Sequence, residues 1–194
     1  MTRLVSGVAG GRRLVVPEGA TTRPTSERVR EAMFSTLTTM LGGWRGVWAL
    51  DLYAGSGALG LEALSRGAQG CLFVERDRRA LAALERNIAS TGLAGAAVRR
   101  GDVASVLSSP PAGPVDLVML DPPYSLPADA LVAVLARLCT QGWSTQDGVV
   151  VVERPSREHQ PDWPTGLHLV RERRYGETRL WYLRRSDDLS RPAS

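Results

Sequence analysis

The stretch 115–124, VDLVMLDPPY, decides the fold of this chain. Its first six residues, Val115–Leu120, are mostly apolar and partly β-branched, which predicts a strand buried on both faces of a parallel sheet. Proline cannot donate a ladder hydrogen bond and pushes the residue before it into an extended or turn conformation, so Pro122 and Pro123 end the strand in a stiff turn. Open α/β sheets bind ligands at this carboxyl edge of their strands.

The turn presents three groups that suit a flat molecule with an exocyclic amine. The Asp121 carboxylate and the Pro122 carbonyl are acceptors, and Tyr124 offers an aromatic face. An aromatic amine is a poor nucleophile because its lone pair is delocalised into the ring. Two acceptors on its N–H bonds would free that lone pair, and the tyrosine ring would stack on the base. Taken alone, the tetrapeptide fits a rigid turn with an aspartate cap equally well.

Strands and helices alternate on both sides of this turn, which predicts an α/β fold with helices on both faces of a doubly wound parallel sheet. Two further strand-like runs join through Tyr175-Gly176-Glu177, which predicts an antiparallel C-terminal hairpin on the edge of a seven-stranded, mostly parallel sheet. Strands are expected at 47–52, 70–75, 96–100, 114–121, 148–153, 167–173 and 178–184, and helices at 25–41, 58–66, 78–90, 128–140 and after Asp102.

The chain is expected to have a small extension before its main domain. Residues 1–23 should form a basic arm or hairpin, because their glycines allow tight turns. Residues 24–185 should form the main domain, which opens with the helix 25–41 and has Thr25 as the N-cap. Residues 186–194 have the composition of a polar, disordered tail.

Bulk properties exclude several classes of protein. With 194 residues, 43% hydrophobic and 23% charged, the chain is long enough for a full core and is neither disordered nor membrane-like. The absence of a signal peptide or membrane span favours the cytoplasm. Cys71 and Cys139 lie far apart, and neither histidine has ligand spacing, so we expect no disulfide and no metal. We also expect a monomer.

The positive charge is concentrated at the two ends of the chain. All 24 basic residues are arginine, and the net charge is +4. Residues 1–50 carry seven arginines against three glutamates, and residues 171–185 carry six against two, whereas the segment between them is mildly acidic. Two basic ends around a central domain suit a polyanion such as nucleic acid, although any single arginine is more simply a solvated surface charge.

A second motif, DLYAGSGALG at 51–60, follows the first core strand. Glycines at such a turn let a ligand approach backbone N–H groups at a helix N-terminus. Glu75 ends the next strand, where a carboxylate can bind both hydroxyls of a ribose. Asp102 and the Val103 amide follow the third strand, where they could meet an adenine edge. Three successive strand ends therefore offer groups for a nucleoside.

The glycine spacing also matches the dinucleotide fingerprint, so two kinds of cofactor have to be weighed. Asp51 stands just before the glycines, where it would repel a pyrophosphate but suit the ammonium of a methionine. The turn at Asp121 is not required for hydride transfer. Both observations favour S-adenosylmethionine over a nicotinamide cofactor.

Together these motifs resemble the RsmD family of class I methyltransferases, over nearly the whole chain from Arg3 to about Leu183. The matching motifs are Ser6-Gly7, Gly11-Arg12-Arg13-Leu14, Arg23-Pro24-Thr25, the run RVREAMF at 28–34, DLYAGSG at 51–57, Glu75, Asp121-Pro-Pro-Tyr and Tyr175-Gly176-Glu177-Thr178. The resemblance implies a Rossmann-like methyltransferase domain over 24–185. It also implies transfer of a methyl group from S-adenosylmethionine to N2 of guanine 966 in 16S rRNA, within the small ribosomal subunit or an assembly intermediate.

Roles for single residues follow from the chemistry and the resemblance together. The donor would be held by Asp51, Gly55 and Gly57 at its methionine end, by Glu75 at its ribose, by Asp102 and Val103 at its adenine, and by Arg23 and Thr25 above the pocket. The target amine would be oriented by Asp121 and Pro122, with Tyr124 stacked on a flipped-out base. The rRNA phosphates would meet Arg3, Arg12, Arg13, Arg28 and Arg30.

Three alternatives stay open at this point. Many amine methyltransferases carry asparagine where this chain has Asp121, so the tetrapeptide alone does not distinguish guanine N2 from adenine N6 or another nucleic-acid amine. A nicotinamide-dependent oxidoreductase and a non-catalytic RNA-binding module are the alternatives from other classes.

Overall fold

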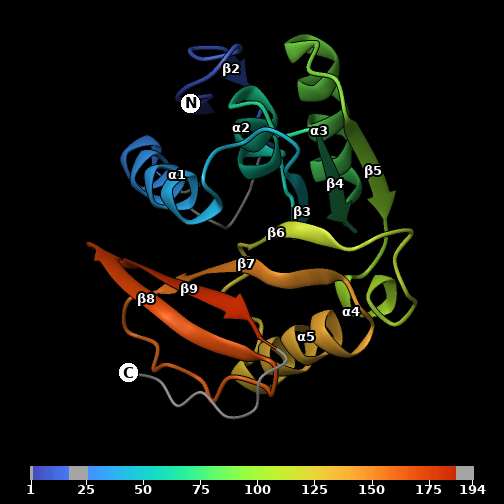
Figure 1. Cartoon of the computed structure of the whole chain (residues 1–194). Helices are drawn as coiled ribbons and strands as arrows, with labels where there is room; N and C mark the ends of the chain where they lie inside the picture. The colour runs from blue at the N-terminus through green and yellow to red at the C-terminus, as the bar shows by residue number, and fades with distance from the viewer. Residues whose placement is uncertain (1, 18–25, 187–194) are drawn as a thin grey trace.

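The computed structural model describes residues 2–17 and 26–186. Figure 1 shows the order of the elements along the chain. They are β1 (Thr2–Arg3), β2 (Arg13–Leu14), α1 (Glu27–Leu41), β3 (Trp48–Leu52), α2 (Ala58–Ser65), β4 (Gly70–Glu75), α3 (Arg78–Thr91), β5 (Ala96–Arg100), α4 (Val103–Val106), β6 (Val115–Leu120), α5 (Ala128–Thr140), β7 (Ser144–Pro155), β8 (Leu167–Tyr175) and β9 (Thr178–Arg185).

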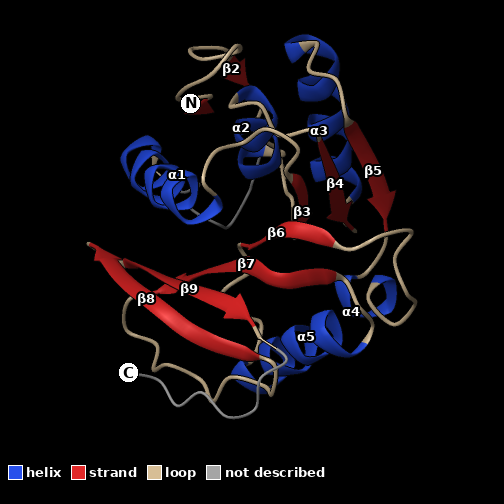
Figure 2. Cartoon of the chain, in the orientation of Figure 1, coloured by secondary structure: helices blue, strands red, loops and turns tan. Residues whose placement is uncertain are grey.

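In the described part of the chain, seven strands form one sheet in the order β5-β4-β3-β6-β7-β9-β8. Strands β3 to β7 are parallel, whereas β9 is antiparallel to both β7 and β8. Helices α1, α2 and α3 cover one face, and α4 and α5 cover the other (Figure 2). The predicted α/β architecture with an antiparallel C-terminal hairpin is therefore confirmed.

Strand β6 shows why the sheet is buried on both faces. Leu117 and Met119 pack into the core beneath α1 to α3, and Val118 and Leu120 pack into the core beneath α4 and α5. All four side chains are at most 1% exposed. An apolar run without polar alternation is what a central parallel strand requires, as the sequence predicted.

The strand order reverses next to β3, and this fixes the position of the site. From β3 the chain adds β4 and β5 on one side, and it then returns to place β6 and β7 on the other. Leu52 consequently pairs with Val74 on one side and with Leu120 on the other. In open α/β sheets, ligands bind outside the carboxyl ends of the strands at such a switch point.

The C-terminal hairpin reaches the same edge of the sheet. Because β9 runs antiparallel to β7, Pro155 at the end of β7 pairs with Thr178 at the start of β9. Thr178 also pairs with Tyr175 at the end of β8. The turn between β8 and β9 therefore lies at the edge where the parallel strands end. Strand β7 is longer than predicted, since it begins at Ser144 and includes Arg154 and Pro155.

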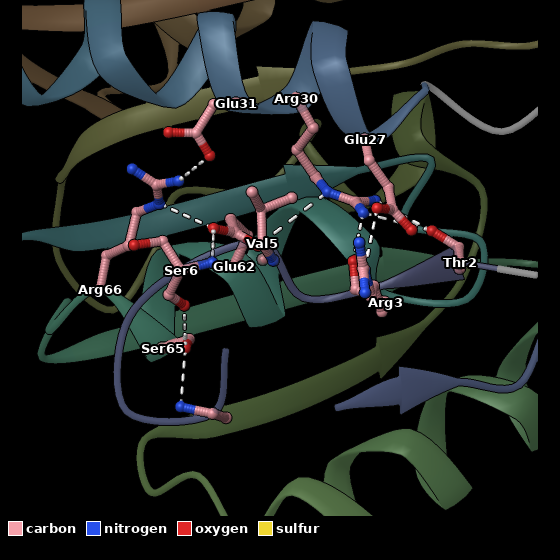
Figure 3. Close-up of polar contacts among 12 residues, drawn as sticks. Thr2, Arg3, Val5, Ser6, Glu27, Arg30, Glu31, Glu62, Ser65 and Arg66 are labelled. Carbon is pink, nitrogen blue, oxygen red and sulfur yellow. Dashed lines mark hydrogen bonds and ion pairs between the residues drawn. The ribbon is translucent and has the colours of Figure 1, made fainter. Parts of the chain in front are cut away.

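The N-terminal arm forms the expected antiparallel hairpin, β1 with β2, and it is docked on α2. The docking point is Glu62, which is fully buried and accepts hydrogen bonds from the backbone of Val5 (2.7 Å) and Ser6 (3.0 Å), as Figure 3 shows. Arg66 binds the same carboxylate at 2.7 Å. A buried carboxylate is stable only when its charge and lone pairs are matched, so these partners fix the arm in place.

Two sequence predictions about α1 are wrong. Arg30, expected to contact rRNA phosphates, is 0% exposed; its guanidinium donates to the Thr2 hydroxyl (3.2 Å) and the Arg3 carbonyl, and its Nε lies 3.9 Å from Glu62 (Figure 3). It is a buried counter-charge for Glu62 and does not reach a phosphate. The helix also begins at Glu27, two residues later than the expected start at 25, because the N-cap is Ser26, whose hydroxyl accepts from the Val29 amide at 3.3 Å.

The described residues place further limits on the molecule. Within residues 2–17 and 26–186, no helix combines the length and apolar character needed to cross a membrane. Over the same residues, no three histidine, cysteine or acidic side chains are gathered as metal ligands. Cys71 is buried and Cys139 is partly buried.

Candidate functional site

Three carboxylates gather at the switch point. Asp51 lies in β3, Glu75 ends β4, and Asp121 directly follows β6. Burial raises the pKa of the Asp51 carboxyl well above its usual value, against the hydrogen bond from Gly60, and the negative charges of Asp121 and Glu75 raise it further. The charges of Asp121 and Glu75 therefore create a negative potential around Asp51 at the carboxyl edge.

The glycine turn after β3 leaves its backbone open to a ligand. Gly55 and Gly57 have φ angles of 56° and 82°, a region that strongly favours glycine. A Cβ at Gly57 would lie 2.4 Å from Leu84 Cδ1, and one at Gly60 would lie 2.2 Å from Phe73 Cε1. At Gly55 the nearest atom is the Tyr53 carbonyl oxygen, 4.0 Å away. Gly57 and Gly60 thus permit close packing, and Gly55 leaves space beside the chain.

Asp51 supports this turn from beneath. The residue is 1% exposed, and its Oδ2 accepts a hydrogen bond from the Gly60 amide at 2.8 Å. The carboxylate thereby satisfies an amide in the first turn of α2, where negative charge is favoured. A direct contact between Asp51 and a ligand ammonium stays a prediction.

Glu75 is fixed by backbone amides on both of its oxygens. Its Oε2 accepts from Gly55 at 2.8 Å, and its Oε1 accepts from Arg76 at 2.7 Å and from Asp77 at 2.8 Å. A carboxylate oxygen has lone pairs for more than one hydrogen bond, so a partly exposed Glu75 held in this way can also accept hydroxyl groups. The arrangement fits the predicted ribose contact.

Asp102 and Val103 lie at the end of β5, where α4 begins. Asp102 caps α4 by accepting from the Ser105 amide at 3.3 Å, and it pairs with Arg76 at 3.5 Å. Val103 as a whole residue is only 3% exposed, and a contact between its backbone amide and an adenine stays a prediction. Burial and then the charge of Asp102 raise the pKa of the Tyr53 hydroxyl to about 12, which places that hydroxyl in the same region.

The turn after β6 has a buried base and an exposed aromatic ring. Pro122 is buried, Asp121 is partly exposed, and Tyr124 is 48% exposed. The Leu126 amide donates to the Pro123 carbonyl at 2.8 Å, which closes a tight turn around Tyr124. An exposed ring beside a carboxylate is a suitable surface for a stacked nucleobase.

Sequence reasoning missed two residues that hold these segments. Arg154 is 3% exposed and donates to the carbonyls of Pro123 (3.1 Å) and Leu126 (2.8 Å). Asn87 in α3 donates to the carbonyls of Ser56 and Val15, both at 2.9 Å, so it ties the glycine turn to the arm. Neither residue belongs to a motif, because both act on backbone carbonyls, which every sequence supplies.

The remaining predicted phosphate contacts are spread over the arm and α1. Arg3 is exposed and pairs with Glu27 at 2.9 Å, and Arg13 and Arg28 are also exposed. Arg12 donates to the Ser90 carbonyl in the last turn of α3. That last turn lies roughly 20 Å along the helix axis from the first turn of α3. These four arginines stay candidates. Arg23 and Thr25 lie outside the described residues.

Comparison with known proteins places the chain in a family. The model of the family described as conserved hypothetical protein 95 matches residues 2–184. Ribosomal RNA small subunit methyltransferase D of Escherichia coli K12 is 34% identical over 175 residues, which cover 90% of this chain and 85% of that protein. The chain belongs to the RsmD family.

Other relatives agree with this membership. The chain is 35% identical to YlbH of Bacillus subtilis, named as a putative rRNA methyltransferase, over 179 residues, which are 91% of this chain and 95% of YlbH. The solved structure of YhhF from Escherichia coli has a TM-score of 0.84 and 33% identity, covering 96% of this chain and 99% of that one. A magnesium protoporphyrin IX methyltransferase from Synechocystis, 14% identical with a TM-score of 0.62, shares the fold alone.

Proposed function

We propose that this RsmD family member transfers the methyl group of S-adenosylmethionine to the exocyclic N2 of a guanine in small-subunit rRNA, at position 966 in the usual numbering. The observation that carries the proposal is the meeting of three segments at one switch point: the glycine turn, Glu75, and the turn that bears Asp121 and Tyr124. The printed names of its relatives support rRNA as the substrate class.

The residues present fit the methyl donor. There is space beside the backbone at Gly55, and the fixed carboxylate of Glu75 can still accept hydrogen bonds from hydroxyl groups. Asp102 lies after β5, the next strand in the sheet beyond β4. S-adenosylmethionine carries positive charge on its sulfur and its ammonium, which the negative potential of Glu75 and Asp121 would attract. The same potential opposes a pyrophosphate, which disfavours a nicotinamide dinucleotide.

The other half of the site suits the target base. S-adenosylmethionine supplies an electrophilic methyl group, so the work of this chain is to position the amine. Asp121 and the Pro122 carbonyl would accept the two N–H bonds of the amine and aim its lone pair. Tyr124, nearly half exposed, would stack on the splayed base. The exposed arginines of the arm and α1 would add phosphate contacts.

The substrate form is also part of the proposal. We expect recognition of 16S rRNA in the small subunit or an assembly intermediate. A monomeric state and a cytoplasmic location stay predictions.

Radiolabelled methyl transfer to small subunits that lack the modification tests the proposal. Digestion of the product to nucleosides should place the label in N2-methylguanosine. Label in N6-methyladenosine would instead favour the adenine alternative. Small-subunit binding without any transfer would indicate a non-catalytic RNA-binding module, and NADH binding without S-adenosylmethionine binding would indicate an oxidoreductase.

A further inference from the structure

The turn that carries Tyr124 is closed by a backbone hydrogen bond. Among the described residues, the backbone hydrogen bond within this turn runs from the Leu126 amide to the Pro123 carbonyl. Tyr124 and Ser125 between them are both exposed. A ring that has to meet a base in one orientation needs a rigid mount, because small misplacements at a reacting centre are costly.

Arg154 supplies that mount from below. It lies near the end of β7 and is 3% exposed. Its Nη1 donates to the Pro123 carbonyl at 3.1 Å, and its Nη2 donates to the Leu126 carbonyl at 2.8 Å. The planar guanidinium thus grips both ends of the turn with two donors whose spacing is fixed.

The positive charge of the buried Arg154 is balanced by the carboxylate of Glu158. Arg154 Nε lies 2.6 Å from Glu158 Oε2. Glu158 is itself held in a turn, since its amide donates to the Pro155 carbonyl at 3.0 Å. Each of the three guanidinium nitrogens therefore has a hydrogen-bond partner, and such partners are what give a buried ion pair a defined geometry.

The turn over residues 155–158, which holds Glu158, is also tied to the C-terminal hairpin. The Ser156 amide donates to the Glu177 carbonyl at 2.7 Å, and Arg179 Nη2 donates to the Ser156 carbonyl at 2.7 Å. Arg154 consequently stands between the hairpin and the turn that carries Tyr124. Both segments lie at the edge of the sheet where the parallel strands end.

We propose that Arg154 is a positioning residue for methyl transfer, which holds the Tyr124 ring where the target base stacks. The inference rests on the proposed function and adds a residue outside its motifs. Lysine keeps the charge at position 154, but a single ammonium cannot reproduce two parallel N–H donors. The Arg154→Lys variant therefore separates geometry from charge.

The first test measures single-turnover methyl transfer to unmodified small subunits. Arg154→Lys should slow transfer about 10- to 100-fold, while the dissociation constant of S-adenosylmethionine changes less than about twofold. Arg157→Lys is the matched control, since Arg157 lies in the same turn and is exposed; its rate should equal that of wild type. Glu158→Gln, which keeps the guanidinium, should slow transfer less than Arg154→Lys.

A double-mutant cycle distinguishes positioning of Tyr124 from general weakening of the fold. In a Tyr124→Ala background, Arg154→Lys should cause little further loss, because the ring that it positions is gone. Losses that multiply in the double variant would overturn the proposal, as would wild-type transfer by Arg154→Lys. Failure of the wild-type protein to methylate small subunits would instead refute the proposed function, so the two failures are distinguishable.

Discussion

The Glu75 carboxylate accepts a hydrogen bond from the Gly55 amide at 2.8 Å. The contact joins the end of β4 to the glycine turn that follows β3, so these two segments together form one side of the candidate site. Because Leu52 of β3 also pairs with Leu120, the turn that carries Asp121 is the next segment along the same edge. The residues proposed to bind the methyl donor and those proposed to bind the target base are therefore held by one continuous sheet.

Replacing Glu75 with glutamine should weaken donor binding. A charge-assisted hydrogen bond contributes about 1.5–3 kcal/mol, so the dissociation constant of S-adenosylmethionine should rise about 10- to 100-fold. Calorimetry on the purified variant measures this change.

A second ligand separates ribose contact from support of the glycine turn. Wild-type protein should bind S-adenosylhomocysteine more tightly than its 2′-deoxyribose analogue, and Glu75→Gln should lose most of that preference. An equal preference in both proteins would show that Glu75 acts on Gly55 alone.

Replacing Asp121 with alanine should stop catalysis and spare donor binding. Removal of one oriented polar group at a reacting centre typically costs at least about 100-fold in rate. Single-turnover methyl transfer and S-adenosylmethionine affinity should be measured together. Asp129→Asn, an exposed acid in the first turn of α5, is the control and should behave as wild type. Unchanged turnover in Asp121→Ala would remove this residue from the mechanism.

Arg12 and Arg13 test the role of the arm. Each phosphate contact contributes about 0.7–0.9 to the slope of log affinity against log salt, so Arg12→Gln with Arg13→Gln should lower the slope by up to about 2. Small-subunit binding across a salt series gives the slope. Arg45→Gln, an exposed arginine before β3, should leave it unchanged. If the double variant keeps the wild-type slope, the arm does not contact phosphates.

Glu62 tests how the arm is anchored. Glu62→Gln leaves Arg30 without its buried counter-charge, and breaking such a pair costs about 3–5 kcal/mol of unfolding free energy. Urea unfolding measures the loss. Glu31→Gln is the matched control, because Glu31 pairs with Arg66 while 54% exposed and should cost less than about 1 kcal/mol. Equal stability of the two variants would show that the buried network does not anchor the arm.

Much of the fold is predictable because local rules and burial agree along the core. The bounds of β4, β5 and α5 match the sequence prediction to the residue. Asp77 caps α3 and Gly92 ends it in the left-handed conformation, both of which follow local capping rules. The acidic strand ends are predictable for the same reason, since strand order alone brings Glu75 and Asp121 to one edge.

The misses arise where a residue depends on a distant partner. Arg30 looked like a surface arginine because its counter-charge, Glu62, lies on another helix, and their pairing leaves no periodic signal. Arg154 is invisible for a related reason, since its acceptors are backbone carbonyls of a turn 31 and 28 residues earlier. The sequence prediction named Thr25 as the N-cap of α1, whereas the N-cap is the neighbouring Ser26, because serine and threonine are both good capping residues.

The most direct measurement is to map the nucleotide that this protein methylates in small subunits lacking the modification. Mass spectrometry of rRNA fragments after reaction with S-adenosylmethionine should find one added methyl group, on N2 of guanine 966, and none with the Asp121→Ala variant. A methyl group on adenine, on a different guanine, or in equal amount with Asp121→Ala would contradict the account.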